Sequence, residues 1–94
     1  MAIARVVSFE RVSQERAEEQ KRRISEGDRP EGMPASEFIM LHDPESETAL
    51  AIVVFETEDD YQRGDEILNA MPTGDTPGQR TSVKKYNVAH RMKD

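Results

Sequence analysis

The chain has 94 residues, a net charge of −6 and no cysteine. A chain of this length forms one domain, so we expect residues 1–94 to fold as a single unit. The absence of cysteine excludes a disulfide framework, a thiol nucleophile and a cysteine-ligated metal. The acidic charge argues against general nucleic-acid binding, which needs a basic surface.

Charged residues make up 34% of the chain and hydrophobic residues 35%. Ordinary domains contain about 25% charged residues, so the expected core is small and a partner subunit would add stability. No apolar run approaches the ~20 residues of a membrane-spanning helix. The first residues lack the basic and long apolar segments of a signal peptide. We therefore expect a cytoplasmic protein with no membrane partner.

Short apolar runs, separated by turn residues, predict the elements of the first half of the chain. Residues 3–9 are rich in Val and Ile and predict a strand. Ser13 is a suitable N-cap for a very polar helix over residues 14–26. Gly27 occupies the position where a left-handed residue commonly ends a helix.

Two further strands are predicted over residues 35–42 and 48–56, joined by a turn that begins Asp43-Pro44. Asp and Pro suit the first two positions of a type I turn. Both faces of the second of these strands are apolar, because side chains alternate between faces. One face carries Ala49, Ala51, Val53 and Phe55, and the other carries Leu50, Ile52 and Val54.

A second helix is predicted to begin after Thr57, an N-cap followed three residues later by the acidic Asp60. Its apolar residues form one stripe, made of Tyr61, Gly64, Leu68 and Met71. Residues 81–92 predict the last strand. Its alternation is irregular around Lys84-Lys85, which indicates a bulge there.

The predicted order β-α-β-β-α-β is that of the ferredoxin-like α+β fold. Right-handed crossovers place the strands in the order 4-1-3-2, all antiparallel, with both helices on one face. Two helices cannot cover the other face, although the strand over residues 48–56 is apolar there as well. A second copy of the chain would bury that face, so we expect a homodimer.

Three segments carry a resemblance to a known group: residues 37–45, 50–55 and 56–61. They resemble the second strand, Asp-Pro turn, third strand and acidic helix start of the dimeric α+β barrel superfamily. That superfamily includes the antibiotic-biosynthesis-monooxygenase-like domains, and the chain is most similar to small bacterial members with no assigned activity. The resemblance implies a dimeric α+β barrel.

Haem-degrading members of that superfamily use an Asn on the first strand, a Trp, and a His on the second helix. Residues 3–9 contain no Asn, the chain contains no Trp, and the second helix contains no His. None of those roles is carried over, and we expect no haem chemistry and no cofactor.

His42, Tyr86 and His90 are the candidates for catalysis. His42 next to Asp43 is a possible general base near neutral pH, or simply a strand-end histidine beside a turn aspartate. Tyr86 and His90 are four apart in the predicted last strand and would share a face, lining a cavity or packing as polar tips.

The fold places His42 and His90 at opposite ends of the sheet, so we expect no metal site within one subunit. Tyr61 and Leu68, near the seam between helix and sheet, are the candidates for a ligand pocket.

Three functions remain open. The first is an uncharacterised dimeric domain that binds a small molecule. The second, implied by the resemblance, is a cofactor-free monooxygenase-like enzyme acting on an aromatic or quinone-type substrate. The third is a small isomerase or dehydratase with His42 or His90 as base.

Overall fold

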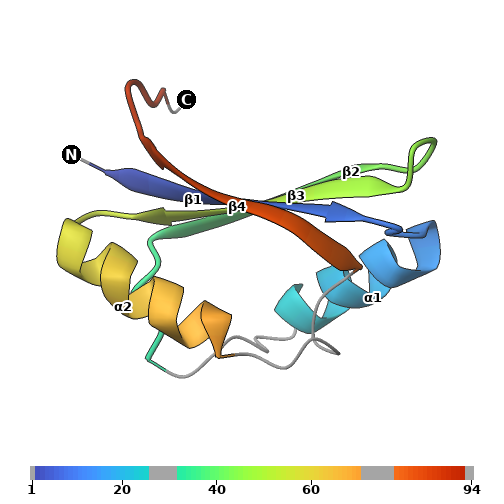
Figure 1. Ribbon diagram of the computed structural model, residues 1–94, viewed down its shortest axis with the longest axis horizontal. Coiled ribbons are helices and arrows are strands. Elements are labelled where there is room, and N and C mark those ends of the chain that lie inside the picture. The colour runs from blue at the N-terminus through green and yellow to red at the C-terminus, as the bar shows by residue number, and fades with distance from the viewer. Residues whose placement is uncertain (1, 26–31, 71–77, 93–94) are drawn as a thin grey trace.

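The protein is a four-stranded antiparallel sheet with two helices on one face (Figure 1). The computed structural model describes residues 2–25, 32–70 and 78–92. In chain order the elements are β1 (Ile3–Glu10), α1 (Gln14–Ser25), β2 (Glu37–Asp43), β3 (Thr48–Phe55), α2 (Glu58–Asn69) and β4 (Gln79–Asn87). The strand order β2-β3-β1-β4 is the predicted order 4-1-3-2 read from the other edge. The predicted ferredoxin-like topology is therefore confirmed.

The sheet face that meets the helices, the inner face, carries the core in two clusters. Near α2 the first cluster joins β1 and β3 to the helix through Ile3, Val53, Phe55 and Tyr61. The second, near the start of α1, consists of Val7, Phe9, Val12 and Ala49. Among the described side chains of α1, Ala17 packs against this second cluster.

Helix α2 begins as predicted. The side chain of Thr57 accepts a hydrogen bond from the amide of Asp60 at 3.1 Å, and acidic residues occupy the first turn. Tyr61 and Gly64 are buried and Leu68 packs against the core, as the predicted stripe requires. The fourth member of that stripe, Met71, and the predicted helix-ending Gly27 lie outside the described residues.

The last strand differs from its prediction at both ends, because β4 spans Gln79–Asn87 rather than residues 81–92. In the described sheet its neighbour is β1, which starts at Ile3 opposite Asn87. The last backbone bond between the two segments in the described residues runs from the Val88 amide to the Ala2 carbonyl at 2.8 Å. The predicted extension of the strand to His90 is therefore wrong, and the alternation that would place His90 on the face of Tyr86 does not reach it.

The bulge in β4 also lies elsewhere than predicted. Ser8 pairs with Ser82 and Phe9 with Arg80, so Thr81 is the extra residue. Its hydroxyl donates to the Ser8 carbonyl at 3.2 Å. The alternation near Lys84-Lys85 is regular: Lys84 lies on the face away from the helices and Lys85 on the inner face, as their partners Val6 and Arg5 do.

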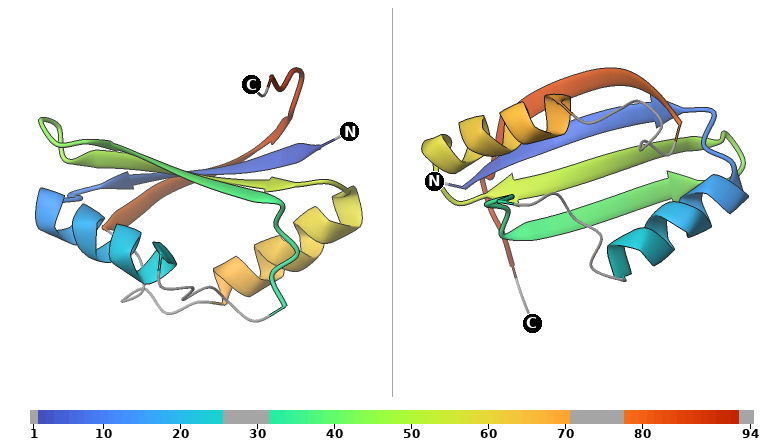
Figure 2. Two further views of the ribbon diagram at one scale, coloured as in Figure 1. Left: turned by 180° about the vertical axis from the view of Figure 1, so that it is seen from behind. Right: turned by 90° about the horizontal axis from the view of Figure 1, so that it is seen from below.

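The sheet face opposite the helices, the outer face, is apolar and partly uncovered. Ile39, Leu41, Leu50 and Tyr86 are all exposed there. The segment after β4 turns to this side of the sheet, as both views of Figure 2 show. The guanidinium of Arg91 lies 3.3 Å from the Glu37 carboxylate and 3.4 Å from that of Glu56. Exposed pairs of this kind usually add little stability.

Within the described residues, no helix is long and apolar enough to cross a membrane.

Candidate functional site

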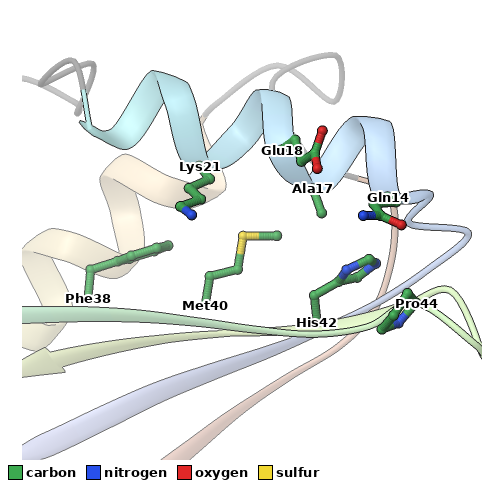
Figure 3. A pocket seen from close by; sticks show the side chains of 8 residues that line it. All are labelled: Gln14, Ala17, Glu18, Lys21, Phe38, Met40, His42 and Pro44. Atoms are coloured by element: carbon green, nitrogen blue, oxygen red, sulfur yellow. The ribbon is translucent and has the colours of Figure 1, made fainter.

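An open groove of about 430 Å³ separates α1 from β2. From the inner face of β2, Phe38, Met40 and His42 project toward the helix (Figure 3). Opposite them α1 presents Gln14, Ala17, Glu18 and Lys21, and Pro44 closes the end beside His42. A volume of this size lies within the usual range of small-molecule pockets, about 300–1,000 Å³.

The groove stays open because of the residues that α1 turns inward. Its four lining residues follow the i, i+3, i+4, i+7 spacing of one helix face. In most helices that cover a sheet this face is apolar, but among these four described residues Ala17 is the one apolar side chain. Phe38 is consequently 42% exposed although it lies on the inner face. The site therefore has an apolar floor and a polar wall.

His42 is the polar group on the floor. Its Nε2 lies 2.8 Å from the backbone carbonyl oxygen of Val12. A carbonyl oxygen only accepts, so Nε2 carries the hydrogen and Nδ1 of the neutral ring is left as an acceptor. This bond ties β2 to the segment before α1 and sets the orientation of the imidazole. The ring is half-buried and borders the groove.

The carboxylate of Asp43, the next residue in the chain, bonds to the turn that follows it rather than to His42. One of its carboxylate oxygens accepts from the amide of Glu45 at 3.1 Å, and the other accepts from the hydroxyl of Ser46 at 3.0 Å. These bonds, with the Ser46 hydroxyl contributing most, hold the pKa of Asp43 below its ordinary value. Asp43 thus stabilises the turn between β2 and β3.

The other two catalytic candidates lie away from the groove. Tyr86 is on the outer face, paired with Ala4, and is 50% exposed. His90 follows β4 at the end of the sheet where Phe55 pairs with Ile3, whereas His42 pairs with Ala49 at the other end. The structure brings none of the three together. Among the described residues, no three His, Asp or Glu side chains gather where a metal ion could bind.

Tyr61 and Leu68, the predicted pocket residues, are packed in the core between α2 and the sheet. Tyr61 meets Phe55 edge to face at 5.7 Å, and the ammonium of Lys85 lies 4.9 Å from the centre of its ring. Burial, helped by the negative charge of Asp65, raises the pKa of Tyr61 above its ordinary value. Neither residue borders the groove beside α1.

Sequence reasoning missed a polar network under β1. Arg5, only 3% exposed, donates from Nε to Asp65 at 2.8 Å and from Nη2 to Asn69 Oδ1 at 3.1 Å. Asn69 in turn donates to Asp65 at 3.3 Å, and Arg80 donates to the same Asn69 oxygen at 3.3 Å. One signal was available: Arg5 stands where the alternation of β1 calls for an apolar residue, two positions from Ile3 and from Val7.

Comparison of this chain with protein-family models, curated proteins and solved structures finds no match.

Proposed function

We propose that the protein is a homodimeric α+β barrel that binds a small, mostly apolar molecule in the groove between α1 and β2. The observation that carries this proposal is the mismatch across the groove. β2 offers Phe38 and Met40, and the four residues of α1 that line the groove include no large apolar side chain. An apolar ligand would supply the missing contacts, at roughly 25 cal/mol per Å² of surface removed from water.

The side chains that line the groove indicate which class of ligand would bind there. The free Nδ1 of His42 favours a hydroxyl or other hydrogen-bond donor at one end, next to Gln14 and Pro44. The ring of Phe38 favours an aromatic or alkyl body at the other end, where Lys21 stands above it (Figure 3). The ligand class that fits best is a hydroxylated aromatic of small size.

A filling mutation tests the groove. Ala17→Leu places a leucine opposite Met40 and His42, so a panel of hydroxylated aromatics should raise the melting temperature of the wild type and not of this variant. The filled groove should also stabilise the unliganded variant by about 1 kcal/mol, because the added methyl groups become half-buried. Glu19→Leu is the control, since it adds the same side chain to α1 at an exposed position outside the groove. Equal ligand shifts in both variants would contradict the proposed site.

The outer face supports the homodimer. Its apolar side chains come from neighbouring strands, with Ile39 beside Ile52 and Leu41 beside Leu50. Leu41 is 50% exposed and Leu50 is 36% exposed, although only 35% of the residues in the chain are hydrophobic. Monomers seldom expose a contiguous apolar patch of this kind. Two copies related by a two-fold axis would bury the patch on each, as the resemblance to dimeric α+β barrels also implies.

Light scattering tests the assembly directly. The wild type should have the mass of a dimer at micromolar concentration. Ile52→Asp, on the outer face, should lower the mass to that of a monomer. A wild-type monomer that unfolds cooperatively would contradict the homodimer.

An enzymatic alternative, a cofactor-free monooxygenase-like activity, is favoured by one feature, the acceptor Nδ1 of His42 at the groove. A base at that position can take the proton of a bound phenol or hydroquinone, and the resulting anion reacts with oxygen more readily. Oxygen uptake with a panel of hydroquinones, compared between the wild type and His42→Gln, tests this role. Equal uptake by both proteins would exclude His42 as the base.

A further inference from the structure

The buried Arg5 has unused hydrogen-bonding capacity. A guanidinium has five N–H donors, and Arg5 uses one on Asp65 and one on Asn69. Its Nη1 group donates to no residue in the described part of the chain. No fully buried side-chain polar atom among the described residues lacks a partner, so Nη1 retains some contact with solvent.

A second guanidinium shares a hydrogen-bond acceptor with that of Arg5. Arg80, on the inner face of β4 opposite Phe9, donates to the Asn69 oxygen that also accepts from Arg5. Both guanidinium groups thus lie within 3.3 Å of one atom. Arg80 is exposed, and Asn69 beside it is exposed too, so this end of the network is open to solvent.

The charges at this point do not balance. Asp65 is the carboxylate that pairs with Arg5, and within the described residues no carboxylate pairs with Arg80. Lys85, the neighbour of Arg5 on β4, is already paired with Glu58. The C-terminal end of α2 contributes roughly half a negative charge. Among the described residues, two guanidinium groups therefore face about one and a half negative charges, which leaves a net positive charge.

Burying an arginine costs several kcal/mol before its partners are counted. An apolar side chain at position 5 would complete the inner face of β1 without that cost. Positions where a sequence breaks the pattern of its own fold are commonly functional. Arg5 is such a position, because both its burial and its open Nη1 depart from what packing alone requires.

We propose that an oxyanion, carried by a carboxylate or phosphate group, binds between Nη1 of Arg5 and the guanidinium of Arg80. Planar guanidinium groups match such anions with paired, charge-assisted hydrogen bonds. This site lies between α2, β1 and β4, whereas the groove lies between α1 and β2. The protein as a whole is acidic, so a local cationic site selects for anions that fit it rather than for polyanions in general.

The test follows the arginine side-chain Nε–Hε signals of the ¹⁵N-labelled full chain by NMR. Inorganic phosphate and acetate are titrated separately at constant ionic strength, with sodium chloride as the reference salt. Saturable shifts of the Arg5 and Arg80 signals in the millimolar range are expected with at least one anion. Saturation by phosphate alone identifies a phosphate site, and saturation by acetate alone identifies a carboxylate site.

A matched pair of variants locates the binding. Arg80→Gln should weaken the affinity at least tenfold, the effect of losing one charge-assisted hydrogen bond. Lys84→Gln removes the same charge from the same strand, but on the outer face, and should change the affinity less than twofold. Equal weakening by both variants, or no saturable shift with either anion, would overturn the proposal. Ala17→Leu should leave anion binding unchanged, so the experiment tests the anion site independently of the ligand proposed for the groove.

Discussion

The contact between α2 and β3 depends on a glycine, and Gly64→Ala is the sharpest test of the packing. A Cβ atom at position 64 would lie 2.3 Å from Cε1 and 2.4 Å from Cζ of Phe55. Ordinary carbon–carbon contacts are about 3.5–4.0 Å, so the methyl group would sit more than ~1 Å too close. Phe55 is fully buried and packs edge to face on Tyr61, which leaves its ring little room to move.

The size of the effect follows from two opposing contributions. Overpacking of a buried site costs about 1–3 kcal/mol, and this clash belongs in the upper half of that range. Alanine is a better helix former than glycine by about 1 kcal/mol. The expected net loss in the free energy of unfolding is therefore about 1–2 kcal/mol. For a domain of this size, that loss lowers the melting temperature by about 5–10 °C.

Thermal unfolding followed by circular dichroism, at one protein concentration, measures this loss. Gln62→Ala is the control, because it places an alanine at an exposed position of the same helix. In a Phe55→Leu background, which removes the ring edge, Gly64→Ala should cost clearly less. If Gly64→Ala proved as stable as the wild type, or more stable, the close approach of α2 to Phe55 would be wrong.

Three further predictions concern the cap of α2, the turn and the buried ion pair. Thr57→Ala should cost about 1 kcal/mol by urea unfolding and Thr57→Ser almost nothing, because serine keeps the capping oxygen. Ser46→Ala should raise the pKa of Asp43 toward its ordinary value in an NMR titration. Because the folded-state pKa of Asp43 is lowered, its contribution to stability is present above the unfolded pKa, about 3.9, and is lost as the pH falls through the folded value. Asp65→Ala should cost about 2–4 kcal/mol by leaving Arg5 buried without its carboxylate, whereas Arg5→Met with Asp65→Leu should cost much less. A double variant as unstable as Asp65→Ala would contradict that reasoning.

Much of the fold follows from local features of the sequence. The apolar runs, the Asp43-Pro44 turn and the Thr57 cap each depend on residues close together in the chain. They therefore predicted five of the six elements to within about two residues at each described end. The element order then limited the topology, because right-handed crossovers allow few arrangements. The opposite positions of His42 and His90 follow from that topology alone.

Tertiary structure decided the rest, because it depends on which partner each residue finds. β4 ends at Asn87, opposite the first residue of β1, Ile3. The apolar pattern of residues 81–92 gives no sign of where this pairing stops. The groove exists because the polar face of α1 happens to lie over Phe38 and Met40. Arg5, Asp65, Asn69 and Arg80 are brought together from three elements, and nothing in their sequence spacing indicates it. Contacts between residues 60 or more positions apart are set by packing across the whole domain, so only the folded chain shows them.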